Sequence, residues 1–233
     1  MRGLSPDEWE VLTLSLKVSG VAIVAVLPLA FVLAWILARW RFPGKVLLDA
    51  LVHLPLVLPP VVTGWLLLLA FGTNAPLGRF FQQTIGLTFL FRWTGAALAA
   101  AVMALPLMVR AMRLSLEAVD RRLESAARTL GAGPWHRFVT VTLPLTAPGI
   151  LAALVLGLAR SIGEFGATIT FASNIPGETQ TLPLAIYSAL QRPGSDLQVA
   201  RLAVLSVLLS VGALVLSEWL ARRSGHGKGR HVL

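Results

Sequence analysis

A charged pair inside an apolar segment is the feature of this sequence with the clearest chemical potential. Arg160 and Glu164 are four residues apart in the stretch Arg-Ser-Ile-Gly-Glu-Phe-Gly, so one α-helix would place them on a single face. Counted from Thr146, Arg160 would lie about 21 Å along that helix. A charge at membrane depth costs at least roughly 2.5–3.5 kcal/mol, so both side chains are expected to face the interior of a helix bundle.

Two interpretations of this pair stay open. In the first, Arg160 and Glu164 neutralise each other and hold their helix against its neighbours. In the second, the pair belongs to the gate of a transport path, where Gly163 and Gly166 let two subunits approach closely. We favour the structural role as the larger part. An anion would be attracted by Arg160 and repelled by Glu164, so tight anion binding is not expected at this position.

Enzymatic chemistry finds little support in the sequence. Ser161 does not lie in a Gly-x-Ser-x-Gly elbow, and the chain has neither a His-Glu-x-x-His motif nor a Gly-x-x-x-x-Gly-Lys-Ser/Thr phosphate loop. There is no cysteine, and His53 has no second metal ligand at useful spacing, so we interpret it as a hydrogen-bonded packing residue. We interpret His226 and His231 as solvated. We therefore expect no catalytic residue, metal or cofactor in this chain; an intramembrane enzyme using Glu164 or Ser161 is a weaker alternative.

The composition indicates a membrane protein. Of 233 residues, 56% are hydrophobic and only 13% are charged, with a mean hydropathy of +0.76. A soluble domain would need more charge to cover its surface. The net charge of +9 could suggest nucleic acid, but the basic residues cluster beside apolar runs, which membrane topology explains better. We predict a single all-α, polytopic membrane domain over residues 1–233, surrounded by lipid and without a nucleic-acid partner.

Five apolar runs have roughly the 17–25 residues that a membrane crossing requires. The predicted membrane-spanning helices are 11–40, 46–71, 93–109, 146–171 and 199–220. Pro55, Pro59 and Pro60 predict that the second of these is broken or kinked. This break, with Thr63 just after it, is a candidate part of a path through the membrane. Residues 182–191 are too few to span, so we predict a re-entrant or surface helix there.

Between the third and fourth runs, charge, glycine and proline interrupt the apolar pattern over residues 110–145. A short, charged helical pattern ends at Gly131, a residue that favours positive φ. Pro134 suits the first turn of a second short helix, on which Trp135 and Phe138 share one face. Two short helices with exposed apolar residues and no core of their own indicate a docking surface.

This segment resembles the cytoplasmic loop of ABC importer permeases, known as the EAA loop. That loop has the pattern Glu-Ala-Ala, three residues, Gly, nine residues, Ile-x-Leu-Pro. Here Ser-Ala-Ala begins at Ser125, Gly131 follows at the right spacing, and Val-Thr-Leu-Pro ends at Pro144. The first position departs from the pattern, because Glu124 lies one place early. The resemblance implies that a separate ATPase docks on Ser125, Ala126, Ala127, Gly131, Pro134, Trp135, Leu143 and Pro144.

Three longer stretches, 53–72, 127–135 and 159–179, resemble the molybdate permeases of this class, and the similarity extends over residues 8–219. It implies a homodimer that forms a path for molybdate or tungstate by alternating access. It also implies two cytoplasmic ATPase subunits, which bind ATP and Mg, and a periplasmic oxyanion-binding protein. Permeases for sulfate, thiosulfate or another oxyanion share much of the pattern and stay an alternative; the docking loop argues against a standalone channel. The residues assigned to the path or its gate are Arg160, Ser161, Gly163, Glu164, Gly166, Pro59, Pro60 and Thr63.

Basic residues predict the orientation. Arg39, Arg41 and Lys45 follow the first run, residues 110–137 carry the second basic group, and the C-terminal tail carries the third. The positive-inside rule places all three in the cytoplasm. The N-terminus is then outside, the C-terminus is inside, and the docking loop lies where an ATPase can reach it. The resemblance implies that this multi-pass protein lies in the bacterial inner (plasma) membrane.

Overall fold

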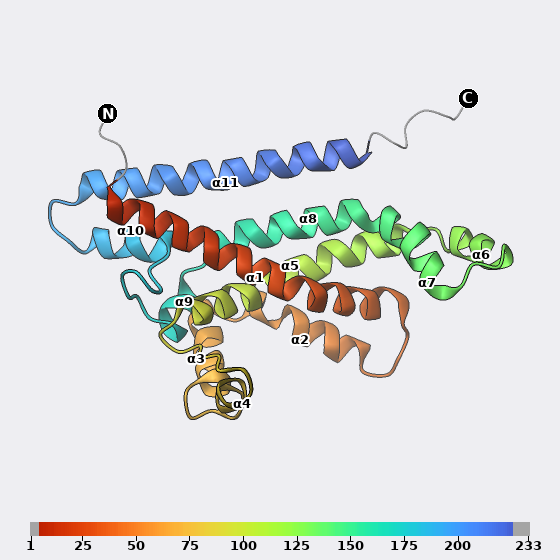
Figure 1. Ribbon diagram of the computed structural model, residues 1–233, viewed down its shortest axis with the longest axis horizontal. Coiled ribbons are helices and arrows are strands. Elements are labelled where there is room, and N and C mark those ends of the chain that lie inside the picture. The colour runs from red at the N-terminus through yellow and green to blue at the C-terminus, as the bar shows by residue number, and fades with distance from the viewer. Residues whose placement is uncertain (1–4, 226–233) are drawn as a thin grey trace.

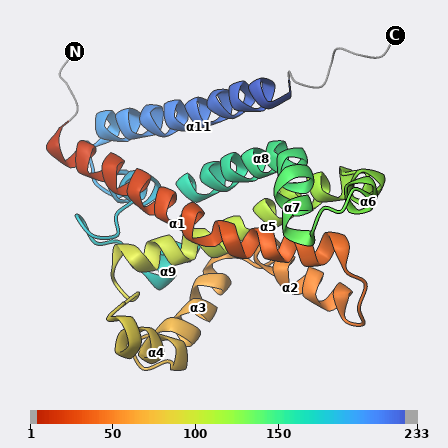
Figure 2. The ribbon, with the colours of Figure 1, turned by 45° about the vertical axis from the view of Figure 1, so that its right-hand side comes forward.

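The computed structural model describes residues 5–225, and all the regular structure in that part of the chain is helical. Four long helices lie roughly side by side, α1 (Pro6–Arg39), α5 (Trp93–Ala118), α8 (Leu143–Ile162) and α11 (Asp196–Gly225) (Figures 1 and 2). Within the described residues, four helical segments are long and apolar enough to cross a membrane, and a bent pair of helices makes a possible fifth. The predicted all-α polytopic fold is therefore confirmed.

Small residues hold the centre of the bundle together. Helix α5 lies between α1 and α8, and its Ala96, Ala100 and Ala104 are buried. Ala30 and Ala34 of α1 are buried in the same core. Side chains this small let helix backbones approach closely, which is how helices associate where the surrounding lipid is itself apolar.

The second predicted span is broken, as its prolines indicated. Helix α2 (Lys45–Val57) ends and α3 (Pro60–Phe71) begins at an angle of 117° to it. Pro59 and Pro60 begin the new helix, because neither has an N–H to continue the old ladder. Pro55, by contrast, lies inside α2 without ending it. Helix α3 and the following α4 (Pro76–Ile85) project from the side of the bundle (Figures 1 and 2).

The predicted fourth span, 146–171, is wrong as a single helix. Helix α8 ends at Ile162, and α9 (Gly166–Phe171) begins after three non-helical residues. The Glu164 carboxylate accepts a hydrogen bond from the backbone N–H of Ala167 at 2.8 Å, so it satisfies a free donor in the first turn of α9.

The docking loop is also shorter than the predicted 110–145. Helix α5 continues to Ala118, and α6 (Arg121–Thr129) follows almost at once. The helical segment that contains α8 begins with α7 (Pro134–Arg137) and a π-helical turn, η1 (Phe138–Thr142). In this turn the N–H of Leu143 bonds to the carbonyl of Phe138, five residues back. The widened turn ends at Thr142, two residues before Pro144, and the helical segment passes through that proline without a break.

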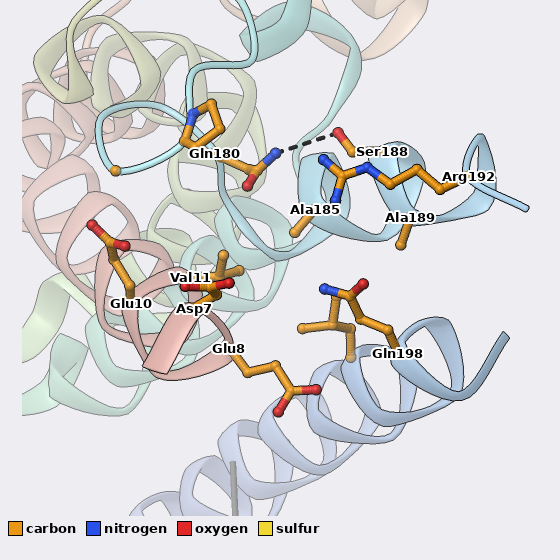
Figure 3. Close-up of a pocket in the computed structure, with 13 residues that line it drawn as sticks. Asp7, Glu8, Glu10, Val11, Gln180, Ala185, Ser188, Ala189, Arg192 and Gln198 are labelled. Atoms are coloured by element: carbon orange, nitrogen blue, oxygen red, sulfur yellow. Dashed lines mark hydrogen bonds between the residues drawn. The ribbon is translucent and has the colours of Figure 1, made fainter. Parts of the chain in front are cut away.

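At the other end of the bundle lies α10 (Leu182–Leu190), which at nine residues is too short to span a membrane. Its Leu182 and Leu184 are fully buried, and the helix packs against α1 and α11. It therefore closes the end of the bundle. With the first turns of α1 and α11 it surrounds a cavity of about 290 Å³, whose lining includes the polar side chains of Glu8, Arg192 and Gln198 (Figure 3). Residues 226–233, with His226, His231, Lys228 and Arg230, lie outside the described residues.

Candidate functional site

Two helix breaks that are far apart in sequence meet in space. Helix α3, which follows the first break, packs on α9, which follows the second. A Cβ atom added to Gly166 would lie 2.7 Å from Cβ of Pro60, and one added to Gly64 would lie 2.7 Å from the carbonyl oxygen of Ala167. The two glycines therefore allow the backbones to touch. Discontinuous helices that meet within a membrane are a recurrent architecture for substrate sites in transport proteins.

The ion pair forms, although not on one helix face as predicted. Nη1 of Arg160 lies 2.6 Å from Oε2 of Glu164, whose position is in the connection after α8. The Glu164 side chain folds back to reach Arg160 and is only 2% exposed, whereas that of Arg160 is 25% exposed. The pair therefore fastens the end of α8 to the start of α9, because the second carboxylate oxygen holds the Ala167 N–H.

The other predicted path residues differ in whether they contact neighbouring groups. In the gate interpretation Gly166 would let a second subunit approach, but a Cβ added there would lie 2.7 Å from Cβ of Pro60 in the same chain, so this side of Gly166 is already in contact with α3. The hydroxyls of Thr63 and Ser161 are buried and have no hydrogen-bond partner in the described part of the chain. Gly163 has space beside it, since an added Cβ would lie no closer than 3.7 Å to its nearest neighbour. A serine nucleophile is activated by an adjacent base, and within the described residues the Ser161 hydroxyl has no hydrogen-bonded partner of that kind.

The predicted docking residues lie at the opposite end of α8, where α6 and α7 project beyond the bundle (Figures 1 and 2). Helix α6 begins at Asp120, whose carboxylate accepts from the N–H of Arg122 at 2.9 Å. It ends before Gly131, which has the expected positive φ of 84°. Gly133 has an extended backbone instead, with φ −64° and ψ 165°. A positive-φ glycine and a helix-starting proline thus shape the loop, as the sequence predicted.

Exposed apolar side chains gather at this end of the described structure. Of the predicted docking residues, Ala127 and Leu143 are half-buried and the others are exposed. Trp135 is 76% exposed and Leu130 is 88% exposed, beside the basic side chains of α6. Exposed apolar groups rimmed by polar residues are typical of protein interfaces. We call the exposed part of residues 121–135 the docking face.

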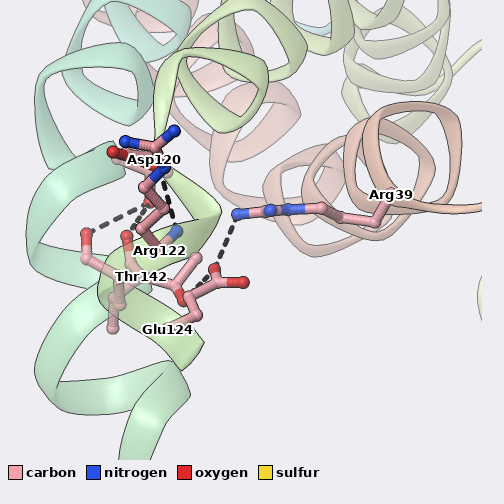
Figure 4. Close-up of polar contacts among 7 residues, drawn as sticks. Arg39, Asp120, Arg122, Glu124 and Thr142 are labelled. Carbon is pink, nitrogen blue, oxygen red and sulfur yellow. Dashed lines mark hydrogen bonds and ion pairs between the residues drawn. The ribbon is translucent and has the colours of Figure 1, made fainter. Parts of the chain in front are cut away.

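One network of polar contacts at the docking face was not anticipated from the sequence. Oε1 of Glu124 accepts from Nη2 of Arg39 at 2.7 Å and from Oγ1 of Thr142 at 2.8 Å (Figure 4). These three residues come from α6, the last turn of α1 and η1. Arg39 is 85 positions from Glu124 in sequence, so no local pattern could have indicated the contact. The only sequence feature that drew attention to Glu124 was its position one place before the glutamate of the EAA pattern.

An aromatic cluster makes a second connection in the same region. The ring of Phe138 lies edge-on to Trp35 of α1, with centroids 5.5 Å apart, and 6.0 Å from that of Phe31. Trp135 lies beside Phe138 on the exposed side, with centroids 5.6 Å apart. Aromatic pairs in these geometries contribute about 0.5–1.5 kcal/mol beyond their buried area. The start of the α7–η1–α8 segment is therefore packed onto the end of α1.

An all-helical bundle with two facing helix breaks, a buried ion pair and an exposed docking face has the architecture of a membrane permease. The chain belongs to the family of binding-protein-dependent transport system inner membrane components, whose family model matches residues 27–226. It is therefore a multi-pass inner-membrane permease subunit of an ABC transporter, and the resemblance noted from the sequence is confirmed.

Similar proteins support the same conclusion. The chain is 56% identical to the molybdenum transport system permease protein ModB of Escherichia coli over 227 residues, which cover 97% of this chain and 99% of that protein. It is 38% identical to the sulfate transport system permease protein CysT of Escherichia coli, over 84% of this chain and 69% of that protein. Its fold matches a bacterial ABC transporter involved in alginate import with a TM-score of 0.72, at 17% identity, covering 94% of this chain and 80% of that one.

Proposed function

We propose that this chain is the permease subunit of an ATP-driven importer that carries molybdate, and also tungstate, across the inner membrane. The observation that carries the substrate is the 56% identity to ModB over almost the whole of both chains. Two copies of the chain enclose the path, two ATPase subunits bind ATP and Mg on the cytoplasmic side, and a periplasmic protein delivers the oxyanion. The docking face supports an ATPase partner, because its apolar side chains Leu130 and Trp135 are exposed in the part of the chain that the structure describes.

Transport proceeds by alternating access. Closure of the ATPases on ATP moves the paired docking faces, and the helices rock to open the path outward and then inward. The contact between α3 and α9 supports the assignment of the path, since non-helical backbone at membrane depth is stable only inside protein or beside water. The residues that line or support the path are Pro59, Pro60, Thr63, Arg160, Ser161, Gly163, Glu164 and Gly166.

Sulfate is the second candidate substrate, because CysT is also a relative, although a more distant one. The test is uptake by proteoliposomes that contain the permease, its ATPase and its binding protein, with labelled molybdate, tungstate, sulfate and phosphate supplied separately. We expect ATP-dependent uptake of molybdate and tungstate, and little uptake of sulfate. Uptake of sulfate at the molybdate rate would contradict the assignment.

We expect the N-terminus to lie outside the cell. Arg39, at the end of α1, contacts α6, so the first basic loop and the docking face share one end of the bundle, as the positive-inside rule requires. The chain has no native cysteine, so a Ser5→Cys variant in intact cells should react with a membrane-impermeant maleimide, whereas Leu130→Cys should react only after the membrane is opened. Labelling of position 5 only from the cytoplasmic side would overturn this orientation.

Gly131→Val should disrupt ATPase docking. A β-branched residue at φ 84° is strained, so the turn between α6 and α7 would move. We expect co-purification of the ATPase and uptake each to fall by roughly tenfold, the effect of about 1.4 kcal/mol. Gly133→Val is the matched control, because the extended backbone there tolerates valine and an added Cβ meets nothing within 4 Å. If both variants bind the ATPase like the parent, the docking assignment is wrong.

A further inference from the structure

Helix α6 carries much of the docking face, yet it has almost no hydrophobic attachment to the membrane helices. None of its nine residues is buried. The aromatic cluster around Phe138 does not include α6, since it joins α1 to the α7–η1 segment. The force that an ATPase applies to α6 must therefore pass through the backbone on either side or through polar side chains.

Glu124 is the polar side chain that makes this connection. A single carboxylate oxygen, Oε1, accepts from both Arg39 and Thr142, so it links α6 to α1 and to the base of the α8 segment at one point. The Arg39 side chain is 10% exposed and that of Glu124 is 24% exposed, and Thr142 is buried. Hydrogen bonds with a charged partner are roughly twice as strong as neutral ones, and partial burial protects this one from screening by salt.

The two partners of Glu124 lead to different parts of the membrane domain. Arg39 lies in the last turn of α1, a helix of 34 residues whose first turn lines the cavity at the far end of the bundle. A helix of that length extends about 51 Å. Thr142 lies in η1, from which α8 leads to Arg160 and the helix breaks. A displacement of α6 therefore reaches both the far end of the bundle and the ion pair through one side chain.

We propose that Glu124 is a positioning residue that couples movement of the docking face to α1 and α8, within the chain rather than across the ATPase interface. This inference rests on the proposed function. Loss of the carboxylate leaves α6 able to bind the ATPase through its exposed apolar residues, but the bound helix then moves without taking α1 and α8 with it. The predicted defect is therefore uncoupling: ATP is hydrolysed and little substrate is carried.

The test uses the full complex of permease, ATPase and binding protein in proteoliposomes. For the parent and Glu124→Gln we would measure co-purified ATPase, ATP hydrolysis and molybdate uptake. Glutamine keeps an oxygen that can accept from Arg39 and Thr142 but removes the charge, so these hydrogen bonds become roughly half as strong. We expect ATPase binding and hydrolysis to stay within about twofold of the parent and uptake per ATP to fall roughly fivefold. Glu117→Gln is the matched control. Glu117 pairs with Arg113 at the same end of the bundle, but it is more exposed and lies on α5 itself, so uptake per ATP should not change.

The possible outcomes distinguish failure of the coupling role of Glu124 from failure of the proposed transport function. If the parent complex binds no ATPase or carries no oxyanion, the proposed function fails. If Glu124→Gln keeps the parental ratio of uptake to hydrolysis, or loses ATPase binding together with uptake, the coupling role is overturned. If that variant does not accumulate, Thr142→Val is measured in the same way, because valine keeps the shape and leaves the Arg39–Glu124 pair intact. A reduced ratio then supports the coupling role, and a parental ratio overturns it.

Discussion

Arg160→Gln is expected to remove most molybdate uptake and to lower the stability of the permease. The substitution leaves the Glu164 carboxylate, which is almost fully buried, without its cation. Breaking a buried pair in this way costs about 3–5 kcal/mol. Because the Arg160 side chain is 25% exposed and water screens part of the interaction, the lower end of that range applies. Thermal unfolding in detergent and uptake in proteoliposomes measure the two effects.

Glu164→Gln should be the milder change for folding. Glutamine keeps an oxygen that can accept from the N–H of Ala167, and the Arg160 guanidinium that is left without a partner can reach solvent. A structural role for the pair predicts that the double variant, Arg160→Gln with Glu164→Gln, recovers part of the stability and uptake with normal ATP coupling. A gate predicts instead that Glu164→Gln assembles normally but leaks or fails to transport.

The control for these variants is Arg92→Gln. Arg92 pairs with Glu178 at 3.8 Å and its side chain is 62% exposed, so its loss should cost no more than about 1 kcal/mol. If Arg160→Gln and Glu164→Gln both assemble and transport like the parent, then neither the structural role nor the gate describes the pair.

Gly64→Ala is expected to have a large effect for a change of one methyl group. The new Cβ would lie 2.7 Å from the carbonyl oxygen of Ala167 and 2.8 Å from Cβ of Thr170, and neither atom can move without displacing α9. Overpacking of this kind costs about 1–3 kcal/mol. Since α9 begins beside the ion pair, we expect reduced uptake together with a lower unfolding temperature.

Gly20→Ala provides the matched comparison. It makes the same chemical change inside α1, where an added Cβ meets nothing within 4 Å. Alanine is the better helix former by about 0.8–1 kcal/mol, so this variant should be as stable as the parent or more so. Parental uptake and stability in Gly64→Ala would show that the close contact of α3 with α9 is not needed for transport.

Local chemistry in the sequence predicted most of the membrane helices and two of their interruptions, but not the break after Ile162. Apolar runs of membrane length predicted the helices, because in lipid the backbone must satisfy its own hydrogen bonds. The break at Pro59 and Pro60 followed from their missing N–H groups, and the turn at Gly131 from its tolerance of positive φ. The spacing around Gly131 also indicated the permease family. Each of these signals depends only on a residue and its near neighbours in the chain.

Only the tertiary structure determined which residues meet around the helix breaks and the docking loop. A four-residue spacing placed Arg160 and Glu164 on one helix, but α8 ends at Ile162, between them, and the Glu164 carboxylate accepts from the N–H of Ala167 in the first turn of α9. Gly166 looked available for contact between subunits, and Pro60 of the same chain occupies that space. Glu124 meets Arg39 across 85 positions of sequence. Such contacts depend on how whole helices pack, and helix packing is set by the summed shapes of many distant side chains, which no local pattern encodes.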